Sequence, residues 1–137
     1  TLKPASGMGY GFNLKALYEM DYLRVDFYLG GVAGGGSDSN MGIFSTDLSV
    51  NWLFSLTNFS PYAGAGVGFG SIYVKADGFD AVKGGPILTM NGGVEMFRLY
   101  STRLIVGVRA ILPLFQLSDG GDDRWVPGLL TEVSFVW

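Results

Sequence analysis

Charged side chains that recur on one side of an alternating pattern are the residues of this chain able to do chemistry. The chain has 137 residues with no cysteine and no histidine. Disulfides, thiolate metal sites and cysteine nucleophiles are therefore excluded. The remaining candidates are carboxylate, guanidinium and ammonium groups within strand-like segments: Lys15, Arg24, Asp26, Asp47, Glu95, Arg103, Arg109 and Glu132.

These eight residues comprise four bases and four acids, which suggests mutual pairing. If they share the interior of a small barrel, they must pair or be hydrated, because an unpaired buried charge carries a large desolvation cost. One interpretation is a structural network of salt bridges and hydrogen bonds that fills the lumen. The other is a conduction or ligand path lined by the same side chains.

Seven segments with a period-two pattern would hold these residues. Each is about 11 to 15 residues long, whereas strands of soluble proteins are most often about 5 to 6 residues. Tilted membrane strands need about 9 to 11 residues to cross the bilayer. We expect strands over residues 6–18, 22–33, 41–54, 61–74, 86–97, 102–116 and 125–137.

The second segment shows the alternation most clearly. Its apolar residues include Leu23, Val25 and Phe27, and they alternate with Arg24 and Asp26. Because successive strand residues point to opposite faces, one face is apolar and the other polar. All eight charges fall on the polar side of their segments, which avoids about 2 to 4 kcal/mol for each lysine or arginine facing lipid at mid-depth.

Composition also favours a membrane protein. Mean hydropathy is +0.31 and charged residues are 15%, against about 25% in soluble domains. The charge-free stretch 48–74 fails as a membrane helix, because it contains Pro61 and alternate glycines from Gly64 to Gly70. Only helices and closed barrels satisfy all backbone hydrogen bonds in hydrocarbon. We therefore predict one all-β domain over residues 1–137, a transmembrane antiparallel up-and-down β-barrel.

The connections predict the orientation. Those near 19–21, 55–60 and 98–101 are short, and those after the second, fourth and sixth strands are longer and rich in glycine and aspartate. Short turns belong to the periplasm and long loops to the exterior, so the C-terminus should be periplasmic. Single-chain bacterial barrels have even strand numbers. We thus expect eight strands, the first being absent before residue 1 because it was cleaved, deleted or supplied by another chain.

Aromatic residues suggest two interfacial girdles, as amphipathic rings prefer. The expected inner girdle contains Tyr18, Tyr22, Trp52, Phe54, Phe59, Tyr62, Phe97, Tyr100 and Trp137. The expected outer girdle contains Phe44, Phe69, Tyr73, Phe115 and Trp125. The inward glycines of 61–74 are expected to make room for Arg103, Arg109 or Tyr28.

Two sequence motifs resemble small bacterial outer-membrane barrels of the OmpA, OmpX and OmpW kind. The run Pro61-Tyr62-Ala63-Gly64-Ala65-Gly66-Val67-Gly68-Phe69-Gly70 is similar to their PYxGxGxG strand. The ending Val133-Ser134-Phe135-Val136-Trp137 is similar to their C-terminal insertion signal, although the family usually closes on phenylalanine. The resemblance implies that Val133, Phe135 and Trp137 are read by the barrel-assembly machinery. It also implies outer-membrane lipid and an envelope protein as partners.

We expect a structural, adhesive or complex-scaffold role with a closed, charge-paired lumen. The alternative, which the OmpW resemblance implies, is a narrow channel or a carrier of small hydrophobic molecules. A subunit of a larger machine and a soluble calycin-like barrel with reversed faces remain open. No enzyme activity, cofactor or metal is expected, and the net charge of −3 argues against nucleic-acid binding.

Two glycine-rich segments are interpreted as exposed connections. Asp119-Gly120-Gly121-Asp122-Asp123 lacks the positional pattern of a calcium loop and is typical of a turn. Gly34-Gly35-Gly36 precedes no helix, so it is interpreted as a flexible loop and not as a phosphate cradle.

Overall fold

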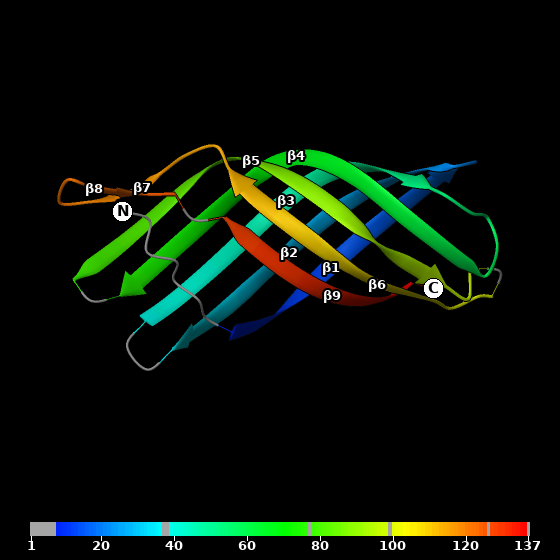
Figure 1. Ribbon diagram of the computed structural model, residues 1–137, viewed down its shortest axis with the longest axis horizontal. Helices are drawn as coiled ribbons and strands as arrows, with labels where there is room; N and C mark the ends of the chain where they lie inside the picture. The colour runs from blue at the N-terminus through cyan, green and yellow to red at the C-terminus, as the bar shows by residue number, and fades with distance from the viewer. Residues whose placement is uncertain (1–7, 37–38, 77, 99, 126, 137) are drawn as a thin grey trace.

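The computed structural model describes residues 8–36, 39–76, 78–98, 100–125 and 127–136. These residues form strands and their connections, without a helix. Seven strands make one antiparallel sheet, and a short hairpin makes a second. Figure 1 shows the long strands strongly tilted and the sheet curled into a half-barrel.

The sheet follows the chain in a simple meander. Its order is β1 (Met8–Met20), β2 (Leu23–Gly36), β3 (Ser39–Leu53), β4 (Phe59–Ala76), β5 (Phe79–Met96), β6 (Arg103–Pro113) and β9 (Gly128–Val136). Between β6 and β9, β7 (Leu117–Asp119) pairs with β8 (Asp122–Arg124). We name the two ends of the half-barrel by their turns: the β7–β8 end, where β4 also turns into β5, and the Asp21 end, where β1 turns into β2.

Tight turns at these ends use left-handed backbone conformations. Gly120 and Gly121 join β7 to β8 with φ of 58° and 101°, which glycine adopts without steric cost and which two-residue hairpins require. Asp21 joins β1 to β2 with φ of 48°, a conformation that aspartate tolerates better than most residues. The interpretation of residues 119–123 as a turn therefore agrees with the backbone.

Two expected long loops are strand instead. β2 extends through Gly36 and β3 begins at Ser39, so Gly34-Gly35-Gly36 lies in a strand and the flexible-loop prediction is wrong. β5 begins at Phe79 instead of residue 86 because Phe79 and Ala81 continue the buried side of the alternation. Among the connections at the β7–β8 end, only the one after β6 is long. Loop length therefore does not distinguish the expected exterior end from the expected periplasmic end.

The curled sheet has a buried concave face and an exposed convex face. Along β3, Asp47, Ser49 and Asn51 are buried, while the intervening Leu48 and Val50 are exposed. The same alternation holds in β6, where Arg109 is fully buried and Val108 is exposed. The assignment of faces made from the period-two pattern thus matches the fold.

Apolar clusters occupy both ends of the concave face, which the sequence analysis did not anticipate. The cluster at the β7–β8 end contains Ile43, Ile72, Val74, Phe79, Ala81, Ile87, Ile111 and Leu117. The cluster towards the Asp21 end contains Leu53, Tyr62 and Ile105. The concave face is therefore polar only in part, with ionic residues in addition to the two apolar clusters.

Two aromatic residues assigned to the girdles point inward. Tyr62 is buried on the concave face, where it shares the parity of Gly64 two residues later. Phe115 packs partly buried against the apolar cluster at the β7–β8 end. Trp137, the last expected member of the inner girdle, lies outside the described residues.

At Gly64, Gly66 and Gly68 of β4, the atoms nearest to an added Cβ belong to β3 and not to the expected Arg103, Arg109 or Tyr28. A Cβ atom at Gly68 would lie 2.1 Å from the Thr46 carbonyl oxygen and 2.5 Å from Asp47 Cβ. Gly66 and Gly64 meet Ser49 and Asn51 in the same way. Polar residues of β3 therefore pack against a row of glycines on β4.

We expect Gly68→Ala to lower the free energy of unfolding by about 1 to 3 kcal/mol, because the added methyl group overpacks this crossing. Urea titration of the purified protein would measure the change. Gly92→Ala is the matched control, since the nearest atom to its Cβ would be the Tyr62 carbonyl oxygen at 3.7 Å. Equal stability of the two variants would contradict the close packing.

Candidate functional site

A first cluster of ion pairs centres on Arg24 of β2. Arg24 and Asp26 are two residues apart and therefore share the concave face. Arg24 Nε donates to Asp26 Oδ1 at 2.7 Å and Nη2 donates to Oδ2 at 2.9 Å. Its third nitrogen, Nη1, donates to Glu95 Oε2 of β5 at 2.9 Å. One guanidinium thus bridges two carboxylates with no exposed surface of its own.

The ring of Tyr62 supports Arg24 from β4. The guanidinium carbon lies 4.4 Å from the ring centroid, within the range of a cation–π contact. Glycines make room for the phenol, because a Cβ atom at Gly107 would approach the Tyr62 hydroxyl to 2.4 Å and one at Gly93 to 3.0 Å. The fifth and sixth strands therefore carry glycine where the tyrosine needs space.

The first cluster continues to residues that the sequence analysis placed in connections. Arg103 Nη1 donates to Glu95 Oε1 at 3.0 Å and to Glu19 Oε1 at 2.7 Å. Arg98 Nη2 donates to Glu19 Oε2 at 2.7 Å. Glu19 was missed because the first strand was ended at residue 18, whereas β1 runs to Met20. The sequence could have indicated it, because Glu19 is four residues after Lys15 and therefore lies on the same face of the strand.

A second cluster centres on Arg109 of β6. Arg109 Nη1 lies 2.8 Å from both carboxylate oxygens of Asp47 on β3. Its Nε lies 3.8 Å from Glu132 Oε2 on β9, and Glu132 also pairs with Lys15 of β1. The guanidinium carbon stands 3.9 Å from the centroid of Tyr28. Both clusters therefore use an arginine stacked on an inward tyrosine.

A row of cross-strand partners connects the two arginines. In register it runs through Arg24, Asn51, Gly64, Asn91 and Arg109. Asn91 Nδ2 donates to Asn51 Oδ1 at 3.4 Å, passing the intervening Gly64. Because Gly64 has no side chain, the two amides can meet over it.

The structure brings all eight predicted residues to the concave face in these two clusters. Glu19 and Arg98 join them, so five cations face five carboxylates and the charges cancel. The ten residues are Lys15, Arg24, Arg98, Arg103 and Arg109 with Glu19, Asp26, Asp47, Glu95 and Glu132. Ion pairing therefore accounts for each of these carboxylates.

Among the described residues, no group of three or more acidic, histidine or cysteine side chains is placed to hold a metal ion. The Asp119, Asp122 and Asp123 side chains of the β7–β8 hairpin are not described. The structure therefore does not test whether this hairpin binds calcium. What the described network does chemically is to hold opposite charges together at fixed geometry.

The predicted insertion signal lies on the last strand. Val133 and Phe135 are exposed on the convex face of β9. Trp137 lies outside the described residues. The visible part of the signal is therefore an apolar row directed away from the ionic clusters.

Comparisons with protein-family models, with curated proteins and with solved structures gave no match for this chain. Within the described part of the chain, no helix is long and apolar enough to cross a membrane.

We expect Asp47→Asn to lower the free energy of unfolding by about 3 kcal/mol, because it leaves the buried Arg109 charge without its nearest partner. Chemical denaturation would measure the loss. Asp21→Asn, the same substitution at an exposed turn, should change stability by less than about 0.5 kcal/mol. Similar effects of the two substitutions would show that the buried pair contributes little.

Proposed function

We propose that this chain forms an outer-membrane β-barrel with a structural, adhesive or complex-scaffold role and a closed, charge-paired lumen. The observation that carries the proposal is the division of the sheet into two faces. The concave face holds both ion-pair clusters, and the convex face exposes apolar side chains along every long strand. Transmembrane β-barrels have this division, with apolar residues facing lipid and polar residues facing the interior.

The apolar convex face supports contact with lipid. Monomeric soluble proteins rarely expose contiguous apolar patches above a few hundred Å². Here exposed apolar residues occur on the edge strands and on the central ones alike. Examples are Tyr10, Phe12, Leu14, Phe27, Leu48, Val67, Phe69, Met90, Val106, Leu129, Val133 and Phe135.

Aromatic residues near the Asp21 end support an interfacial girdle there. Tyr22 and Trp52 stack with ring centroids 6.0 Å apart. Phe97 and Tyr100 make an edge contact at 6.2 Å. Since amphipathic rings prefer the headgroup region, this end is proposed to lie at the periplasmic interface. The β7–β8 end then faces the exterior, where it would present its acidic, glycine-rich hairpin.

The packing of the concave face favours a scaffold over a channel. Arg24, Glu95 and Arg109 have no exposed surface, and buried apolar clusters lie towards both ends of the concave face. A conduction path would instead need polar or charged groups that contact water along the pore. The proposed partners are therefore lipid, the barrel-assembly machinery acting on β9, and an envelope protein, without an enzymatic step.

The proposal predicts a depth-dependent penalty on the convex face. Val67 is 62% exposed in the middle of β4, and Val82 is 70% exposed on β5 beyond its pairing with β6. In lipid vesicles, Val67→Arg should cost about 2 to 4 kcal/mol of unfolding free energy, because arginine at the bilayer midplane is poorly solvated. Val82→Arg should cost about 0 to 1 kcal/mol. Reversible denaturation would measure both, and equal values near zero would refute lipid contact at Val67.

If the lumen is closed as proposed, the protein should not conduct ions. In planar bilayers the reconstituted full chain should show no large, reproducible open state, because ion pairs and apolar side chains fill the interior. Recording at several voltages, with empty detergent as the control, would check this. A stable conductance that changes when Arg109 is replaced by alanine would instead favour the channel.

A further inference from the structure

The gap between β1 and β9 is the least complete part of the sheet. We propose that this gap, the seam, is a docking site for one added polypeptide strand, antiparallel to both edges and uncharged on its concave side. The inference deepens the proposed barrel and rests on it, since the added strand would close the half-barrel. Four properties of the seam specify what fits.

Strand direction is the first property. All six ladders of the seven-stranded sheet are antiparallel. With an odd number of strands, β1 and β9 therefore run in the same direction. No backbone ladder joins them in the described part of the chain. A single strand between them can be antiparallel to both, which continues the pattern of every existing pair.

Width is the second property. Side chains bridge the seam where backbones do not: Lys15 of β1 pairs with Glu132 of β9, and Ser134 Oγ lies 3.4 Å from Asn13 Oδ1. Neighbouring strands are about 4.8 Å apart, so a one-strand gap separates the edges by about 10 Å. Two side chains reaching towards each other span such a distance. The bridges thus fit a gap of one strand.

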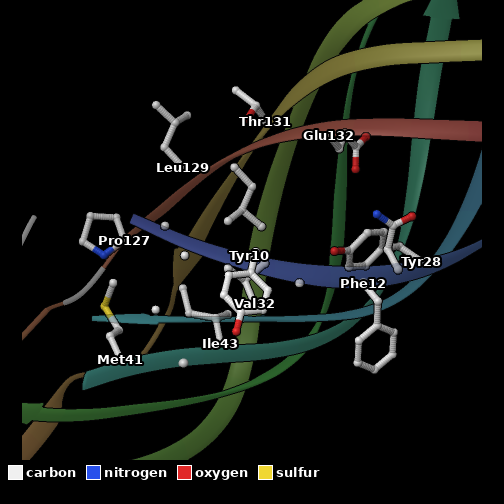
Figure 2. Close-up of a pocket in the computed structure, with 17 residues that line it drawn as sticks. Tyr10, Phe12, Tyr28, Val32, Met41, Ile43, Pro127, Leu129, Thr131 and Glu132 are labelled. Atoms are coloured by element: carbon white, nitrogen blue, oxygen red, sulfur yellow. The ribbon is translucent and has the colours of Figure 1, made fainter. Parts of the chain in front are cut away.

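Shape is the third property, and it differs along the seam. Towards the β7–β8 end lies a cavity of about 460 Å³, whose wall includes Val32, Met41 and Ile43. Figure 2 shows these three side chains together at one part of the cavity, with Tyr28 and Glu132 at another. The inward edge positions at this level are glycines, Gly9 and Gly11 of β1. Large apolar side chains of the added strand would fill this volume.

Towards the Asp21 end the seam has room only for small inward side chains. There the Lys15–Glu132 and Asn13–Ser134 bridges already cross the concave side. Inward residues of the added strand at this level must be small, such as glycine or serine.

Charge is the fourth property. Because the five cations and five carboxylates of the concave face balance, an inward lysine or arginine on the strand would find each carboxylate already paired with a cation. Its outward residues should be apolar, in line with Leu14 and Val133 on either side.

Cysteine cross-linking tests the seam directly, since the natural chain has no cysteine. Leu14→Cys and Val133→Cys place a thiol on the convex side of each edge, and Val67→Cys places one in the middle of the sheet. The probe is a synthetic peptide of about 11 residues with outward leucine and valine and one central outward cysteine. Its inward residues are glycine and serine in the first half and leucine in the second.

After mild oxidation in detergent, this peptide should cross-link to both edge variants at least ten-fold more than to Val67→Cys. A peptide with the order of its inward residues reversed, and one with an inward lysine, should each cross-link several-fold less. Circular dichroism of the three variants would verify that they fold alike.

Equal labelling of Val67→Cys, equal labelling by the reversed peptide, or no cross-link at all would each overturn the docking site. Disulfide dimers of Val133→Cys that exclude the peptide would assign the seam to a second copy and would equally overturn it. The Val67→Arg measurement in vesicles does not depend on these outcomes. Failure of the seam and failure of the membrane assignment are thus separately visible.

Discussion

Charge pairing on the concave face is the constraint on which this structure depends. An ionised side chain withdrawn from water is tolerated only when opposite charges and hydrogen bonds replace its hydration. Arg24 meets this condition with three nitrogens on two carboxylates and a tyrosine ring below. Arg109 meets it in part: Nη1 bonds both Asp47 oxygens and the Tyr28 ring lies against the guanidinium, while Nε and Nη2 have no hydrogen-bond partner among the described residues. The curvature of the sheet, the glycine tracks and the inward tyrosines all serve these contacts.

The pairs also tie together strands that are far apart in the chain. Arg24 and Glu95 are separated by 71 positions, and Lys15 and Glu132 by 117. Glycine on one strand accompanies a bulky polar side chain on its neighbour, as at Gly68 beside Asp47 and Gly93 beside Tyr62. Backbone pairing between neighbouring strands does not by itself fix how strongly the sheet curls. The long-range ion pairs across the concave face restrict this curvature.

The concave face pairs ten charged side chains, whereas the convex face exposes apolar ones. The two apolar clusters lie towards the ends of the concave face, and the ionic clusters lie between them. At the seam between the edge strands, side chains alone span the gap.

The sequence by itself determined the faces of the strands, since the parity of a residue follows from the period of two alone. Seven long strands, the inward position of all eight predicted charges and the turn around Gly120 could be predicted from local pattern. The reach of β5 back to Phe79 could not, because Phe79 is held by Ile72 and Val74, which the apolar cluster brings together.

Only the tertiary structure decided which charges pair. Parity places Arg24 and Arg109 on one face, but the stagger of neighbouring strands selects Glu95 for the first and Asp47 for the second. It likewise placed Tyr62 beneath a guanidinium and brought Glu19 into the network. Local sequence fixes the side of a strand on which a residue lies. The register and curvature of the whole sheet fix its height and its neighbours.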